Sequence, residues 1–206
     1  GYGCRWLVRS GNEVFFLLVD LTTEKEYLWR TNGSPEGAAV VREMPTETWG
    51  AVAFGGGILF DGLSSASGTE PWISDGTAAG THVLKDVVPG PRSGLQSEIV
   101  AGGSTAYFVG GDSWHELWKT DGTEAGTTPI LEMSSPYYVL VGQIDGTLYF
   151  FAYSADSYRW SLWRSDGTAA GTRAFECGRH AGRLHRDRPP LTTRRDASSL
   201  PYDSPS

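Results

Sequence analysis

Aspartate is the residue type best placed for chemistry, because it recurs in copies of the phrase Asp-Gly-Thr-x-x-Gly-Thr. Three full copies begin at Asp75, Asp121 and Asp166. A repeated Asp/Gly loop could bind Ca²⁺, but this ion takes six to eight oxygens, usually from several carboxylates in one loop. Each loop here has one aspartate, and only one copy adds a second acid, Glu124. We therefore expect no metal and no cofactor, with Ca²⁺ as the alternative.

The same residues build a turn if each has a local task. We expect Asp166 to accept backbone N–H bonds from two or three residues on, and Gly167 and Gly171 to adopt positive φ angles. A degenerate first copy has Asn32 in place of aspartate, which keeps the capping oxygen and loses the charge. The sequence therefore favours structural turns at Asp75, Gly76, Asp121, Gly122, Asp166 and Gly167.

Tryptophan is the second candidate, since an exposed indole can stack on a sugar ring. Trp72, Trp118 and Trp163 occupy one fixed place in each copy, which is more typical of packing between neighbouring units. Other tryptophans lie outside these repeated positions, and among them we predict Trp49, Trp114 and Trp160 as ligand contacts. The last two fall in connecting loops of unequal length, where a repeated scaffold usually carries its specificity.

Catalytic patterns are not evident. The four histidines occupy unrelated repeat positions, and the sequence has no HExxH, GxSxG, Walker A or CxxC motif. The spacing leaves open whether carboxylates meet at the centre of the fold. A net charge of −7 argues against a nucleic-acid partner, and no apolar run approaches the ~20 residues of a membrane helix. We expect no enzyme, no nucleic-acid partner and no membrane-spanning segment.

These residues must be positioned by a repeat. The motif tryptophans Trp29, Trp72, Trp118 and Trp163 are 43, 46 and 45 residues apart, and an apolar pair ending in Phe precedes each one. A period of this length with turn signals about every ten residues is typical of a four-stranded β-propeller blade. The strands expected in a unit are illustrated by residues 147–153, 115–120, 81–86 and 96–101. The sequence predicts an all-β, propeller-like array of about four four-stranded blades, with a β-solenoid as the competitor.

The strings PWISDGTAAGT, LWKTDGTEAGT and LWRSDGTAAGT resemble the bacterial repeat family named for its consensus, ELWxxDGTxxGT. The copy from Glu116 to Thr127 matches that consensus completely, and the resemblance covers residues 1–176. Proteins of this family look like large secreted or surface-attached proteins, so the resemblance implies an extracellular or cell-surface location. It implies no common enzymatic activity.

Two functions follow as expectations. The first is a non-enzymatic extracellular scaffold for protein interaction or adhesion. The alternative is a carbohydrate-binding propeller that uses the loop tryptophans. The partner would be a protein or a glycan, and the array would also associate through open blade edges if it is a fragment of a larger propeller.

The end of the chain reads differently from the rest. Residues 1–176 carry a net charge of −10, whereas residues 177–206 carry +3 and are rich in Ser, Pro and Arg. Such a composition predicts a disordered basic tail, or else a shifted reading frame that cut a longer array short. The start, Gly-Tyr-Gly, suggests that the natural N-terminus is missing.

The N-terminal segment Cys4–Val8 resembles the strand that would follow the fourth unit. We therefore expect it either to complete the fourth blade and close a ring, or to belong to an open fragment. In a closed ring Cys4 and Cys177 would lie close enough for a disulfide.

Overall fold

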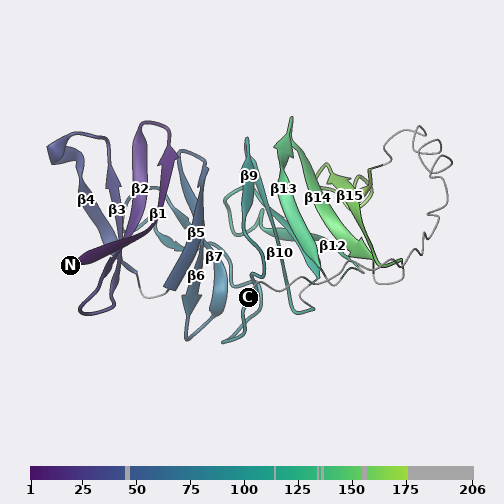
Figure 1. The fold of residues 1–206 in the computed structure, drawn as a ribbon, viewed down its shortest axis with the longest axis horizontal. Helices are drawn as coiled ribbons and strands as arrows, with labels where there is room; N and C mark the ends of the chain where they lie inside the picture. Colours follow the sequence, from purple (N-terminus) through teal and green to yellow (C-terminus); the bar gives the residue numbers. More distant parts are fainter. Residues whose placement is uncertain (45–46, 114, 134, 136, 155–156, 176–206) are drawn as a thin grey trace, which may run out of the picture. The chain divides into compact units, whose positions relative to one another are not determined.

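The computed structural model describes residues 1–175 apart from residues 45–46, 114, 134, 136 and 155–156 (Figure 1). It contains four antiparallel sheets of four strands, each built from consecutive strands. The first sheet contains β1 (Tyr2–Ser10), β2 (Glu13–Asp20), β3 (Glu26–Thr31) and β4 (Ala39–Met44), with the short 3₁₀ helix η1 (Pro35–Gly37) before β4. The second contains β5 (Glu47–Phe54), β6 (Gly57–Ser64), β7 (Gly68–Ser74) and β8 (His82–Val83).

The third sheet contains β9 (Val100–Gly102), β10 (Thr105–Gly110), β11 (Glu116–Thr120) and β12 (Thr128–Glu132). The fourth contains β13 (Tyr138–Ile144), β14 (Thr147–Ser154), β15 (Arg159–Ser165) and β16 (Arg173–Ala174). The prediction of an all-β chain with four four-stranded units is confirmed. The expected tail and Cys177 lie outside the described residues, so the disulfide with Cys4 stays a prediction; Cys4 itself is exposed on β1.

The expectation that the N-terminal strand completes the fourth blade is wrong. Strand β1 pairs with β2, with Val8 opposite Phe15 and Leu7 opposite Phe16. The fourth sheet has its own first strand, β13, paired with β14. The reason is the tight hairpin at Gly11, whose φ of 59° lets the chain reverse directly into β2. The strand before each glycine turn therefore belongs to the sheet of the unit that follows it.

Aromatic pairs recur at one place in every sheet. Phe16 and Trp29, Phe60 and Trp72, Phe108 and Trp118, and Phe150 and Trp163 are cross-strand partners whose ring centroids are 5.9–6.1 Å apart. Near-parallel rings on neighbouring strands add to sheet stability beyond their buried area. The Phe landmark and the Trp landmark of the repeat are therefore one structural unit.

Three apolar clusters join consecutive sheets. In the first, Trp72 and Phe60 of the second sheet pack with Phe15, Leu17 and Leu28 of the first. The others join the second sheet to the third around Trp118, and the third to the fourth around Phe150 with Trp163 at the margin. Trp72, Trp118 and Trp163 therefore pack between neighbouring sheets, as the sequence predicts.

The Asp-Gly-Thr turns close on themselves. The Asp166 Oδ1 atom accepts hydrogen bonds from the Thr168 backbone N–H (2.9 Å) and hydroxyl (2.7 Å), and the Thr168 hydroxyl oxygen accepts one from the Gly171 N–H (3.0 Å). The copies at Asp75 and Asp121 repeat these bonds. Asn32 accepts the corresponding pair of bonds from Ser34. One acceptor oxygen is therefore enough for the turn.

The two glycines of the turn have different roles. Gly167 has a φ of 86°, as predicted, and Gly76 and Gly122 match it. Gly171 does not have a positive φ, so that expectation is wrong. A Cβ atom at Gly171 would overlap the Asp166 carboxylate, and glycine is required there for space.

Replacing Asp75 with alanine is expected to lower the melting temperature by about 2–4 °C, because the Thr77 N–H and hydroxyl lose their acceptor. Replacement with asparagine should cost less than half as much, since Asn32 already serves in the first copy. The same bonds lower the pKa of Asp75, so its contribution is present above the ordinary value near 3.8 and is lost in stronger acid. Thermal unfolding followed by circular dichroism tests this, and equal losses for both variants would contradict it.

Candidate ligand-binding groove

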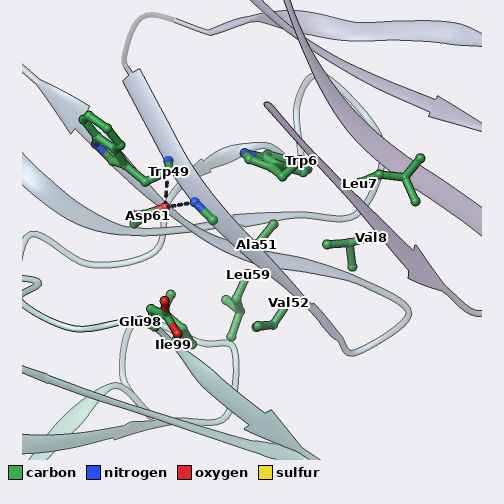
Figure 2. A pocket seen from close by; sticks show the side chains of 11 residues that line it. Trp6, Leu7, Val8, Trp49, Ala51, Val52, Leu59, Asp61, Glu98 and Ile99 are labelled. Carbon is green, nitrogen blue, oxygen red and sulfur yellow. Dashed lines mark hydrogen bonds between the residues drawn. The ribbon is translucent and has the colours of Figure 1, made fainter. Parts of the chain in front are cut away.

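Trp49 lies at a β-bulge in the second sheet. The pairing of β5 with β6 shifts register between Thr48 and Ala51, which leaves backbone N–H groups without ladder partners. The Asp61 Oδ1 atom accepts hydrogen bonds from the Trp49 N–H (3.1 Å) and the Gly50 N–H (2.7 Å) (Figure 2). The bulge and this carboxylate hold Trp49 with its side chain 62% exposed.

A buried carboxylate supports the same position from the first sheet. Glu26 is 4% exposed and accepts hydrogen bonds from the Thr48 N–H (3.1 Å) and hydroxyl (3.3 Å). It forms an ion pair with Arg5 (2.8 Å), whose guanidinium lies 5.7 Å from the centroid of the Trp49 ring. Burial raises the pKa of Glu26, while Arg5 and Thr48 oppose that shift. Trp49 is therefore anchored on two sides.

A groove of about 340 Å³ opens beside Trp49. Figure 2 shows the side chains that line it, which come from β1, β5, β6 and the segment before β9. Its apolar lining is Trp6, Leu7, Val8, Ala51, Val52, Leu59 and Ile99, and its acidic groups are Asp61 and Glu98. An apolar floor with two carboxylates suits a ligand that is partly apolar and carries a cation or several hydrogen-bond donors.

A second cavity of about 460 Å³ continues the groove, because both share Trp49, Asp61 and Glu98. Its further lining is mostly polar and includes Arg92, Ser93, Gln96 and Ser97. Arg92 forms an ion pair with Asp112. The two cavities together offer room for an extended ligand that passes the indole of Trp49.

Glu70 is the most strongly perturbed acid of the described residues. It is fully buried and accepts hydrogen bonds from the Val87 N–H and the Gly94 N–H, both at 2.9 Å. Burial raises its pKa to about 7, although these bonds oppose the shift. No solvent reaches this side chain, so we interpret it as the anchor of the segment between β8 and β9 rather than as a catalytic acid. That segment also supplies Glu98 to the groove.

Two of the three predicted ligand contacts, Trp49 and Trp160, lie on different sheets. Trp49 forms part of the groove, and Trp114 lies outside the described residues. Trp160 is 50% exposed and lies within β15, so its expected position in a loop is wrong. There its ring packs 5.5 Å from Tyr153 on β14. The cross-strand pairing of Tyr153 with Trp160 extends the sheet beyond the point where the sequence suggested a loop.

No single sequence motif predicts the groove. Arg5, Glu26, Asp61 and Glu98 belong to three different sheets or connections. Asp61 gave one signal, since it interrupts the apolar run from Ile58 to Leu63 in a buried strand. Over the described residues, no three His, Cys, Asp or Glu side chains are grouped as a metal site requires. His82 lies in β8 of the second sheet and His115 lies just before β11 of the third, while His180 and His185 lie outside the described residues.

Comparison with known proteins shows the fold alone. A crystal structure of a puromycin hydrolase mutant complexed with PGG is similar with a TM-score of 0.56 and 14% identity, over 85% of this chain and 29% of that one. TolB from Acinetobacter baumannii gives a TM-score of 0.49 and 10% identity, over 82% of this chain and 55% of that one. No protein-family model and no curated protein matches the chain. The arrangement is thus propeller-like, and this chain spans only part of each structure's length.

No helix within the described part of the chain is long and apolar enough to span a membrane.

Proposed function

We propose that this chain is a non-enzymatic scaffold that binds a segment of another protein in the groove beside Trp49. The observation that carries the proposal is the exposed indole of Trp49, which lies beside the Arg5 guanidinium on a backbone that Asp61 holds. Large exposed aromatic side chains that are fixed in position lose little conformational entropy on binding. Asp61 fixes the backbone of Trp49, and its side chain is accessible.

The groove favours one kind of protein segment. Its apolar floor accepts a hydrophobic side chain, and Asp61 and Glu98 favour Lys or Arg beside it. The described region is acidic overall, as is the whole chain at −7. The ligand we propose is therefore an extended peptide that combines an apolar anchor with a basic residue. The resemblance of the repeats to ELWxxDGTxxGT proteins supports an extracellular or cell-surface location and a role in adhesion.

Carbohydrate is the second candidate ligand. The second cavity places Gln96, Asp61 and Arg92 near Trp49, and a sugar ring can stack on an indole while its hydroxyls bond to such polar groups. This ligand would use the polar half of the groove rather than the apolar floor. The two candidates therefore differ in which cavity contributes most of the binding.

Replacing Trp49 with alanine is expected to weaken binding at least about tenfold, because the residue offers the largest exposed aromatic surface of the groove. The probes are a phage-displayed library of random peptides and, in parallel, a glycan array. Peptides that combine an apolar residue with Lys or Arg should be enriched on the wild-type chain. Their dissociation constants are then measured by isothermal titration calorimetry.

Trp160→Ala is the matched control, since Trp160 is half exposed on a different sheet. It should leave peptide affinity unchanged. Glycans retained by the wild-type chain and lost with Trp49→Ala would replace the peptide proposal with the carbohydrate one. Equal loss of affinity in the two variants, or no binding by either class of probe, would overturn the groove as the site.

A further inference from the structure

The first sheet exposes a row of apolar side chains, one from each strand. Leu7 lies opposite Phe16, and Phe16 lies opposite Trp29. Trp29 in turn lies opposite Val40. Leu7 is 65% exposed and Val40 is 47% exposed, while the two rings are half-buried. We call this row the leading face.

The equivalent rows of later sheets are covered. In the second sheet Phe60 and Trp72 are 1% and 5% exposed, and they pack against Phe15, Leu17 and Leu28 of the first sheet. The Phe and Trp rows of the third and fourth sheets pack in the same way on the sheets before them. The leading face is thus built like a surface that another sheet covers.

The fourth sheet exposes its other face, the one that does not bear Phe150 and Trp163. Val139, Phe151 and Leu162 are successive cross-strand partners on it. Val139 is 52% exposed, Phe151 is 40% exposed and Leu162 is half-buried. The corresponding pair of the first sheet, Leu17 and Leu28, is fully buried under the second sheet. We call these three residues the trailing face.

The Asp-Gly-Thr turn of one sheet contacts the sheet before it. The Lys119 Nζ atom of the third sheet donates a hydrogen bond to the Gly167 carbonyl in the turn of the fourth (2.8 Å). The turn of the second sheet lies equally close to the first sheet, because a Cβ atom added at Gly76 would touch Phe15 and Arg30. Gly33 has a similar φ of 89°, yet among the described residues no atom lies within 4 Å of the place where its Cβ would be. The turn at Gly33 is therefore built like the others, but no described sheet packs against it.

The fourth sheet carries a cavity of the kind that receives such a turn, which we call the seat. Over the described part of the chain, a cavity of about 400 Å³ is lined by Arg164, Asp166, Gly171 and Arg173, among other residues of the fourth unit only. The corresponding cavity of the second sheet is lined by Ile73, Asp75, Gly80 and His82, and also by Asp121 and Gly122 from the turn of the third sheet. The comparison shows which element belongs in such a seat: the turn of a following sheet.

We propose that two copies of this chain associate head to tail, with the leading face of one packed on the trailing face of the other. The turn at Gly33 would enter the seat beside Arg164 and Arg173, as the turn at Gly122 does between the second and third sheets. Glu36, exposed next to that turn, adds a charge opposite to the two arginines. This contact is heterologous, so it leaves one free end of each kind on the pair. The inference does not rest on ligand binding in the Trp49 groove, although Leu7 belongs to both surfaces.

Sedimentation velocity of the full 206-residue chain over a concentration series tests this inference. The wild-type chain should form dimers and longer species as concentration rises. Val40→Glu on the leading face and Phe151→Glu on the trailing face should each lower the association constant at least about tenfold. Leu21→Glu is the matched control, because Leu21 is 66% exposed in the turn after β2 and should leave association unchanged. Melting temperatures measured in dilute solution establish that the variants remain folded.

Mixing the two weakened variants distinguishes head-to-tail contact from any symmetric one. The Val40→Glu chain keeps its trailing face and the Phe151→Glu chain keeps its leading face, so an equimolar mixture should form one-to-one dimers that grow no further. Association by only one of the variants, or none in the mixture, would overturn the head-to-tail geometry. A wild-type chain that stays monomeric at its highest soluble concentration would overturn the inference as a whole.

Discussion

Replacing Phe150 with alanine is expected to lower the free energy of unfolding by about 3–5 kcal/mol. Phe150 is fully buried in the cluster that joins the third and fourth sheets, where it stacks on Trp163 with ring centroids 6.1 Å apart. Alanine would remove this stacking and leave a cavity between two sheets that a rigid backbone closes only in part. Urea denaturation followed by tryptophan fluorescence and circular dichroism measures the loss.

Phe151→Ala supplies the comparison within the same strand. Phe151 points to the other face of the fourth sheet and is 40% exposed, so in dilute solution its loss should cost less than half as much. The pair separates the effect of burial from the effect of removing a phenyl ring from β14. Similar losses in the two variants would contradict the assignment of faces on which both the packing account and the head-to-tail contact depend.

Replacing Glu70 with glutamine is expected to abolish a pH dependence of stability between about pH 4.5 and pH 7. The folded chain holds the pKa of Glu70 at about 7, above its ordinary value of 4.5. The folded state therefore binds more protons than the unfolded state in this interval, and stability falls as pH rises through it. The stabilising contribution is fully present below pH 4.5 and is lost above pH 7. Integrated over the shift, the loss reaches up to about 3 kcal/mol.

The measurement is the difference in unfolding free energy between the wild-type chain and Glu70→Gln at several pH values, which cancels groups that both share. Near pH 5 the variant should be less stable by about 1–3 kcal/mol, because an amide cannot accept from both Val87 and Gly94. Near pH 8 the difference should be smaller by up to about 3 kcal/mol, because only the wild-type chain loses stability as Glu70 ionises. Glu98→Gln, a change of an exposed carboxylate on the same segment, should leave the pH profile as it is. Parallel curves for the wild-type chain and Glu70→Gln would refute the account.

Periodicity was sufficient to predict the sheets because their stabilising pairs are local. Each Phe–Trp pair joins neighbouring strands of one unit, so its spacing recurs visibly along the sequence. The allocation of strands to sheets was harder, since a hairpin at Gly11 and a strand that closes a ring require the same alternation of side chains. The role of Gly171 was also hidden, because a need for space beside Asp166 and a need for positive φ both select glycine.

The groove was predictable only through Trp49. Its bulge arises from a mismatch in register between β5 and β6, which no single strand contains. Asp61 and Glu26 then satisfy the N–H groups of Trp49 and Thr48 across distances in sequence of 12 and 22 residues. Contacts of this kind depend on how sheets pack, and a repeat pattern carries no information about them where the units differ.

The building of each sheet from consecutive strands has a consequence for how such a protein changes over time. Among the residues that the structure describes, no strand is shared between the first and the last sheet, so no pairing between these strands has to be broken when a whole unit is gained or lost. The Phe–Trp row and the Asp-Gly-Thr turn meet the same kind of neighbour at each junction. A whole unit can therefore be duplicated or deleted, and the number of units can change during evolution while the contacts between neighbouring sheets stay the same.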